Sequence, residues 1–237
     1  MKGEGVMKYT TLLMDADDTI FDFPKCEYHA LRSALTENGF RFDDDICSAF
    51  SSINSALWKK IELGQITRSE MRVRRFSELL EKCFDGYKET GSSIEMLADS
   101  YVRHLAKNAF YIDGAREALA ELKAVYDIYI ITNGLKTVQE GRFALSGLGE
   151  YVKGMFVSDA MGVGKPDKAF FDIVLENIKE KDTSRILVVG DSLTSDMKGG
   201  RNSGLDTCLY DPRCKVTMPD ELCDYRIESL AELLRLE

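Results

Sequence analysis

Two hydrophobic patterns divide the chain. From about residue 111 onward, short apolar runs alternate with stretches whose apolar residues recur every three or four positions. The short runs are typical of strands buried on both faces, and the longer stretches are typical of amphipathic helices. This alternation predicts a parallel sheet, to which an early apolar run also belongs. The expected strands are 11–14, 128–131, 154–157, 185–189, 206–210 and 225–227, and the expected helices are 115–125, 137–146, 168–178, 195–202 and a terminal helix to 236.

Residues 23–110 follow only the helical pattern, and Thr67 and Glu70 have the spacing of a capping box. A long helical insertion directly after the first strand is typical of a cap domain. The sequence therefore predicts an α/β fold with a core domain of residues 1–22 and 111–237 and a helical cap of residues 23–110. We expect the cap to close over the carboxyl edge of the sheet, with hinges near 21–24 and 110–114.

Composition and charge narrow the possible partners. The 237 residues are 44% hydrophobic and 30% charged, with a net charge of −9. This charge argues against a nucleic acid polymer or an anionic membrane as partner, but not against a small anionic metabolite. The sequence has no apolar run of membrane-spanning length and no signal-like start, and its six cysteines have no metal-binding spacing, so a cytoplasmic protein with reduced thiols is expected. Met1 and Met7 are both possible translation starts.

Side chains that could bind a ligand or take part in a reaction follow several of the expected strands. They are Asp15 and Asp17 after the first strand, Thr132 at the end of the second, Lys165 in a later loop and Asp191 after another strand. Taken singly, most of them have a structural explanation, such as a helix cap or a solvated lysine. Because ligands of open parallel sheets bind beyond the carboxyl ends of the strands, the whole set favours one shared site. A cluster of carboxylates needs a compensating cation, and oxygen ligands favour Mg²⁺.

Four stretches resemble the motifs of the haloacid dehalogenase-like hydrolase superfamily. They are Asp15-x-Asp17-x-Thr19, Thr132-Asn133, Gly164-Lys165-Pro166 and Gly190-Asp191-x₄-Asp196. The resemblance covers the whole chain, and the set is specific although each piece is weak. It implies a Rossmann-like core with a helical cap inserted after the first strand. It also implies a Mg²⁺-dependent phosphatase that acts on a small phosphorylated metabolite.

The resemblance implies a role for each carboxylate. Asp15 would attack phosphorus and form an aspartyl-phosphate, and Asp17 would protonate the leaving oxygen and later activate water. The Mg²⁺ ligands would be Asp15, the main-chain carbonyl of Asp17, and Asp191. Asp196 would orient the metal ligands, whereas Asp18 has no catalytic role.

The resemblance also implies how the phosphoryl group is held. Thr132, Asn133 and Lys165 would bind it, with the Thr132 hydroxyl and backbone amides donating hydrogen bonds and Lys165 adding positive charge. Thr132 and Lys165 are therefore counted as catalytic together with Asp15 and Asp17.

Further stretches resemble the pyrimidine nucleoside 5′-monophosphate phosphatases of this superfamily. They are 15–21, Leu57-Trp58, Gly64-x-Ile66, Arg75-Phe76 and 131–134. Packing within the helical segment is the favoured explanation of Trp58 and Phe76, with base stacking as the alternative. Residues 63–68, where the helical pattern breaks, are the candidate for contacting a nucleoside.

Several alternatives stay open. Asp17 separates this chain from the dehalogenases of the superfamily, which lack the second Asp. A sugar-phosphate phosphatase or phosphomutase would carry the same four motifs. A phosphoacceptor signalling module uses similar residues, but the large helical insertion argues against it. The physiological substrate and the choice between monomer and homodimer are not decided by the sequence.

Overall fold

The computed structural model describes residues 8–84, 91–218 and 220–236. The chain divides into two compact units, of which the first combines Met1–Asp22 with Ala109–Glu237 and the second is Phe23–Asn108. The sequence placed the second boundary two residues later, after residue 110. Residue 110 lies with the first unit because the Asp22 N–H donates to the Phe110 carbonyl at 2.9 Å, and a β-bridge joins Phe21 to Tyr111.

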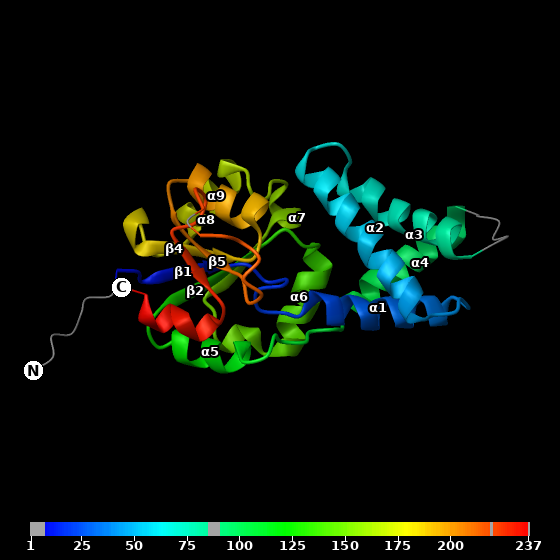
Figure 1. Cartoon of the computed structure of the whole chain (residues 1–237), viewed down its shortest axis with the longest axis horizontal. Coiled ribbons are helices and arrows are strands. Elements are labelled where there is room, and N and C mark those ends of the chain that lie inside the picture. Colours follow the sequence, from blue (N-terminus) through cyan, green and yellow to red (C-terminus); the bar gives the residue numbers. More distant parts are fainter. Residues whose placement is uncertain (1–7, 85–90, 219, 237) are drawn as a thin grey trace, which may run out of the picture. The chain divides into compact units, whose positions relative to one another are not determined.

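The first unit is built on a six-stranded sheet of described residues, in the order β3-β2-β1-β4-β5-β6 (Figure 1). All neighbouring strands are parallel, so the predicted α/β fold with a parallel sheet is confirmed. The strands are β1 (Thr11–Met14), β2 (Asp127–Thr132), β3 (Gly154–Val157), β4 (Ile186–Gly190), β5 (Asp206–Tyr210) and β6 (Tyr225–Ile227).

The strand β1 lies in the interior of the sheet, between β2 and β4. Met14, its last residue, pairs with Ile130 on one side and Val189 on the other. Every residue of β1 is buried, as expected for a parallel strand covered on both faces. The carboxyl ends of β1, β2 and β4 therefore meet at the same edge of the sheet.

Helices cover both faces of the sheet, and the alternation along β1 decides which side chains meet them. Leu12 and Met14 belong to a core cluster that includes residues of α5 (Ala115–Leu122) and of the terminal 3₁₀ helix η4 (Leu230–Arg235). Leu13 belongs to a second cluster, which includes Phe170, Phe171 and Val174 of α8 (Lys168–Asn177). The sheet is thus packed on both sides.

Two expected helices differ from prediction in type, and the helix expected over 115–125 ends three residues earlier, at Leu122. The terminal helix is the 3₁₀ helix η4, and the helix expected over 195–202 begins as a π-helical turn, η3 (Leu193–Met197), before α9 (Lys198–Asn202). The N–H groups of Asp196 and Met197 both donate to the Ser192 carbonyl, at 3.0 and 3.1 Å, which widens this turn. The other helices among the described residues of the unit are α6 (Lys136–Ser146), the unpredicted α7 (Ser158–Met161) and the short 3₁₀ helices η1 (Leu148–Glu150) and η2 (Thr183–Arg185).

The described residues of the second unit form α1 (Phe23–Glu37), α2 (Asp44–Glu62), α3 (Arg68–Cys83) and α4 (Gly91–Leu105). The helix α1 packs against α4, and α2 packs against α3. Thr67 caps α3, and its reciprocal hydrogen bonds with Glu70 confirm the predicted capping box. The buried rings of Phe50, Phe76 and Tyr101 lie with centroids 5.2–5.5 Å apart and form the interior of the unit.

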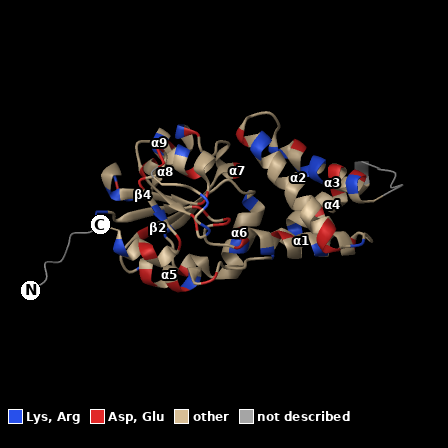
Figure 2. Ribbon diagram, in the orientation of Figure 1, with Lys and Arg blue, Asp and Glu red and all other residues tan. Residues whose placement is uncertain are grey.

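Acidic and basic residues are interspersed along the helices of each unit (Figure 2). Among the described residues, no helix combines the length and the apolar character that crossing a membrane requires.

Candidate active site

The turn after β1 carries the first two candidate carboxylates. The N–H of Asp15 donates to the Val189 carbonyl at 2.8 Å, so the pairing with β4 continues one residue beyond the strand. The Ala16 carbonyl accepts the N–H of Phe21 at 2.8 Å, which folds the chain back sharply. Asp18 occupies the left-handed region of this turn, with φ of 62°, and Asp tolerates that conformation better than most residues. Asp15 is thereby fixed at the end of the central strand.

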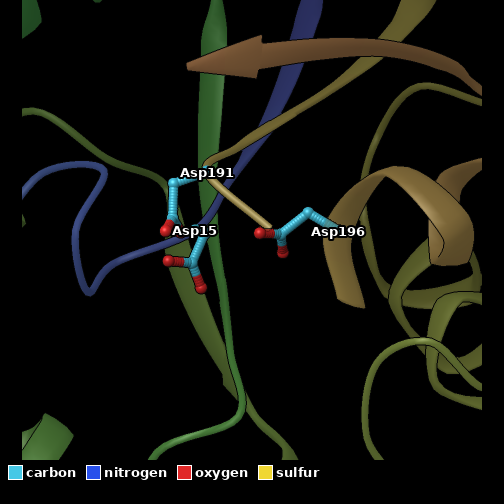
Figure 3. Close-up of side chains that lie close together, drawn as sticks. All are labelled: Asp15, Asp191 and Asp196. Atoms are coloured by element: carbon cyan, nitrogen blue, oxygen red, sulfur yellow. The ribbon is translucent and has the colours of Figure 1, made fainter. Parts of the chain in front are cut away.

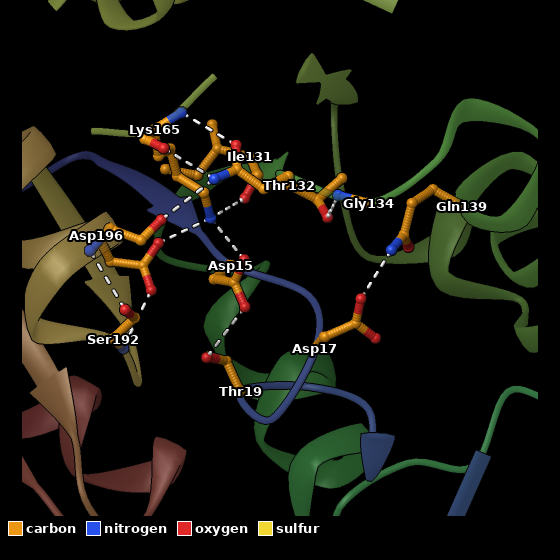
Figure 4. A network of polar contacts seen from close by, with 12 residues as sticks. Asp15, Asp17, Thr19, Ile131, Thr132, Gly134, Gln139, Lys165, Ser192 and Asp196 are labelled. Carbon is orange, nitrogen blue, oxygen red and sulfur yellow. Dashed lines mark hydrogen bonds and ion pairs between the residues drawn. The ribbon is translucent and has the colours of Figure 1, made fainter. Parts of the chain in front are cut away.

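Lys165 joins three elements through its ammonium group. Its Nζ donates to Asp15 Oδ1 at 2.5 Å, to Asp196 Oδ1 at 2.7 Å and to the Ile131 carbonyl at 2.8 Å (Figure 4). Burial favours a lower pKa for Lys165, but Asp15 and Asp196 outweigh it and raise that pKa. Lys165 is therefore charged, and its three donors are engaged within the protein. A phosphoryl oxygen would have to replace one of these acceptors to receive a hydrogen bond from it.

Asp15, Asp191 and Asp196 bring a carboxylate oxygen each within 4.8 Å of one another. Figure 3 shows the three side chains close together, with the carboxyl groups of Asp191 and Asp196 extending toward Asp15. Desolvation first, and then the neighbouring carboxylates, raise the pKa of Asp15 to about 7 against the attraction of Lys165. The same causes raise the pKa of Asp191 to about 9, although the exposure of this residue lets solvent moderate the rise.

This cluster fits a hard divalent cation. Three carboxyl groups face a single ammonium, and the raised pKa values of Asp15 and Asp191 reflect the free-energy cost of ionising carboxyl groups that are desolvated and close together. Carboxylate oxygens are the ligands that Mg²⁺ prefers. Within the described ranges, this is the one group of three or more His, Cys, Asp or Glu side chains with such spacing.

The position of Asp196 depends on a glycine in β4. A Cβ atom on Gly190 would lie 2.3 Å from Asp196 Oδ2, so only glycine leaves room for this carboxyl group. The same oxygen accepts the Ser192 N–H at 3.2 Å. Because its other oxygen accepts from Lys165, Asp196 holds the ammonium in place from the wide turn after β4.

Thr132 and Asn133 lie at the end of β2, next to the Lys165 loop. The Thr132 hydroxyl oxygen accepts the Gly134 N–H at 3.1 Å, which leaves its proton available for donation. The Asn133 amide donates to the Lys165 carbonyl at 2.8 Å and accepts the Lys165 N–H at 2.9 Å. The Asn133 side chain thus fixes the loop that carries Lys165.

Asp17 turns toward α6 and meets two residues that the sequence did not identify. Its Oδ1 forms an ion pair with Arg142, and its Oδ2 accepts from Gln139 Nε2 at 2.8 Å. Gln139 and Arg142 are buried, although polar side chains on a surface helix normally face solvent. Their spacing of three residues on the face that also carries the buried Val138 was the available signal.

The candidate base-binding residues of the second unit are mainly packing residues. Phe76 is fully buried against Phe50 and Tyr101, as the favoured explanation required, whereas Trp58 is half-buried. Arg75 is buried as well, with its guanidinium carbon 4.5 Å from the centroid of the Tyr101 ring.

The parallel sheet and the carboxylate–lysine site at its edge define the class of protein. Residues 9–204 match the model of the haloacid dehalogenase-like hydrolase family, and the chain belongs to this family. It is therefore a hydrolase by family, as the sequence predicted.

Particular relatives match over nearly the whole chain. The HAD-hydrolase YfnB of Bacillus subtilis is 38% identical over 229 residues, which cover 97% of this chain and 95% of the relative. A crystal structure of YfnB bound to magnesium superimposes with a TM-score of 0.88 and covers 97% of this chain and 98% of that one.

Two further relatives carry a substrate in their names. The pyrimidine 5′-nucleotidase PynA of Streptococcus pneumoniae is 35% identical over 96% of this chain and 94% of its own length. The pyrimidine 5′-nucleotidase YjjG of Escherichia coli is 30% identical over 97% of this chain and 98% of its own length.

Proposed function

We propose that this protein is a Mg²⁺-dependent phosphatase that hydrolyses small phosphate monoesters through an aspartyl-phosphate on Asp15. The observation that carries the proposal is the position of Asp15 at the end of the central strand, 2.5 Å from a charged lysine and beside two further carboxyl groups. Family membership and the two nucleotidase relatives support the same reaction class.

Asp15, Asp191 and the main-chain carbonyl of Asp17 would hold Mg²⁺, with Asp196 orienting the site through Lys165. Bound there, the ion would offset the repulsion between the Asp15 carboxylate and an anionic phosphate. The magnesium-bound structure of YfnB supports this choice of metal.

In the first half of the reaction, an Asp15 carboxylate oxygen attacks phosphorus. A bond forms between Asp15 and phosphorus as the bond between phosphorus and the ester oxygen breaks. The carboxyl group of Asp17 gives its proton to the leaving oxygen, so an alcohol departs. The Thr132 hydroxyl donates a hydrogen bond to a phosphoryl oxygen, and Lys165 keeps the Asp15 carboxylate in place.

In the second half, a water molecule attacks the phosphorus of the aspartyl-phosphate. Asp17, now a carboxylate, accepts a proton from that water. The bond between phosphorus and Asp15 breaks, and inorganic phosphate leaves. Asp15 is again a carboxylate and Asp17 is again protonated, so the cycle closes.

Pyrimidine nucleoside 5′-monophosphates are the proposed substrate class. PynA and YjjG, both named as pyrimidine 5′-nucleotidases, match this chain over nearly its full length, and the stretches at 57–58, 64–66 and 75–76 resemble the same branch. Sugar phosphates are the alternative, because phosphatases and mutases that act on them would use the same reactive groups.

The nucleophile and the substrate class are tested together. Asp15→Asn is nearly isosteric, so we expect an unchanged unfolding midpoint and a loss of turnover of at least about 1,000-fold. Initial rates on a panel of nucleoside monophosphates and sugar phosphates, with and without Mg²⁺, measure both points. Substantial activity of the variant would overturn the role of Asp15, and a preference for sugar phosphates would overturn the nucleotide assignment alone.

A further inference from the structure

Both carboxylate oxygens of Asp17 are held by side chains of a single helix. Arg142 pairs with Oδ1, and Gln139 donates to Oδ2 at 2.8 Å. Figure 4 shows the Gln139 side chain reaching from α6 toward Asp17. Asp17 lies more than 120 residues from Gln139 and Arg142 in sequence, so the fold, and not local sequence, brings the three groups together.

The burial of these groups is unequal. The Arg142 side chain is fully buried and Gln139 is 2% exposed, whereas 26% of the Asp17 side chain remains accessible. A buried guanidinium and a buried amide cost free energy unless they are paired. Here their partner is a carboxylate whose remaining surface is open. The two buried side chains therefore bind the Asp17 carboxylate from the protein interior and leave part of it accessible to solvent.

Gly134 provides the space for this contact. A Cβ atom at that position would lie 2.2 Å from Gln139 Nε2 and 2.9 Å from its Cγ, so any larger residue would displace the amide. The glycine follows Thr132 and Asn133 in the loop after β2. The candidate phosphoryl-binding Thr132, at the end of β2, is thus followed two residues later by the glycine that makes room for the contact of Gln139 with Asp17.

We propose that Gln139 and Arg142 are positioning residues that fix the rotation of the Asp17 carboxyl group, and that Gly134 acts through Gln139. The inference rests on the proposed role of Asp17 as proton donor to the leaving group. Each carboxylate oxygen has two lone pairs, so one bond from Gln139 leaves Oδ2 a second position for a proton. Proton transfer needs a defined direction, and a carboxyl group held at both oxygens keeps it.

The test compares two leaving groups. The 4-nitrophenolate of 4-nitrophenyl phosphate departs without protonation, whereas the ribose oxygen of uridine 5′-monophosphate requires a proton. Because kcat/KM reports only the steps up to the first phosphoryl transfer, the later attack of water does not affect the comparison. We expect Gln139→Leu to lower kcat/KM for uridine 5′-monophosphate by about 10-fold or more, and for 4-nitrophenyl phosphate by less than about 3-fold.

Arg142→Lys keeps a charge but loses the planar fork, and it should show the same selective loss. Gly134→Ala should also lower kcat/KM selectively for uridine 5′-monophosphate, because its methyl group would displace the Gln139 amide from Asp17. If Gly134 acts through Gln139, the Gly134→Ala change should have little further effect in a Gln139→Ala background. Full additivity of these two changes would overturn the link between Gly134 and Gln139.

Glu140→Gln is the matched control, since it changes an exposed residue of the same helix. Equal losses on both esters in folded Gln139→Leu protein, or no loss on either, would overturn the positioning role. Mg²⁺ affinity, measured by calorimetry, should not change, and a marked decrease would assign Gln139 to the metal site instead.

The Asp17→Asn variant separates this inference from the proposed function. If it shows the leaving-group dependence and Gln139→Leu does not, only the positioning role fails. If Asp17→Asn shows no such dependence, or the wild-type chain hydrolyses neither ester, the proposed role of Asp17 or the proposed function fails first.

Discussion

Asp15 illustrates, at the scale of one residue, how a site can be arranged at the expense of stability. Its carboxyl group is buried beside two other carboxyl groups. Within the described cluster, the negative charge of the three groups is offset by the positive charge of Lys165 alone. The pKa of Asp15 rises to about 7 from an ordinary value of 3.8. The folded protein without metal therefore holds a proton that the unfolded chain releases at lower pH.

This difference predicts the pH dependence of stability without metal. Between about pH 4 and pH 7 the folded state binds more protons than the unfolded state, so the free energy of unfolding falls as pH rises through this window. The contribution of Asp15 is complete below the unfolded pKa and lost above the folded one. We expect the unfolding midpoint in a chelating buffer to fall by at least about 3 °C more in the wild type than in Asp15→Asn over this range.

Adding Mg²⁺ above pH 7 should raise the midpoint of the wild type and have a much smaller effect on Asp15→Asn and Asp191→Asn. In the experiment without metal, an equal fall of the unfolding midpoint with pH in the wild type and in Asp15→Asn would contradict the assignment of the pH dependence to the Asp15 carboxyl group.

At the scale of elements, the position of Asp196 in the wide turn after β4 depends on the last residue of that strand. Gly190 ends the strand, and the π-helical turn that follows places Asp196 directly against it. Gly190→Ala would put a methyl group 2.3 Å from Asp196 Oδ2, so the carboxyl group must move away from Lys165. We expect Mg²⁺ affinity to fall by about 10-fold or more, since groups that orient metal ligands typically contribute that much.

Gly154→Ala is the control for this change. It also adds a methyl group to a strand of the sheet, but the nearest atom, in the Tyr129 ring, lies at an ordinary 3.7 Å. Calorimetric titration with Mg²⁺ and thermal unfolding of both variants make the comparison. Equal effects of the two substitutions would show that Gly190 matters only as part of the strand.

The elements that follow a simple hydrophobic period were predictable from sequence. The strands 11–14, 154–157, 206–210 and 225–227 have the predicted limits. The wide turn at 193–197 was not predictable, because its shape depends on two N–H groups that share the Ser192 carbonyl. Gln139 and Arg142 were missed for a related reason: a polar residue on a helix suggests a solvent-facing position until its tertiary partner is known.

At the scale of the whole molecule, the reactive groups are gathered in one unit. The carboxylates, Lys165 and Thr132 all belong to the first unit, and each is suited to a phosphoryl group rather than to the rest of an ester. Selectivity among phosphate monoesters must therefore come from other residues. We propose the segment 63–68, between α2 and α3, as its source.

Gln65→Ala and Arg68→Ala test this proposal. We expect each to change the ratio of kcat/KM values among nucleoside monophosphates by about 5-fold or more, with turnover of 4-nitrophenyl phosphate nearly unaffected. Thr67→Ala, which lies in the same segment and should cost about 1 kcal/mol of stability, controls for a general effect on α3. A uniform loss on all substrates, or none on any, would exclude the segment.

The hydrogen bond from Asp22 to Phe110 and the bridge from Phe21 to Tyr111 have an architectural consequence. They fasten together the two points at which the chain leaves the sheet unit and returns to it. An insertion whose ends are pinned side by side can be exchanged for a longer or shorter one without changing the strand order. We therefore expect that the helical unit can be replaced by another insertion while the strand order and the carboxyl edge of the sheet stay unchanged.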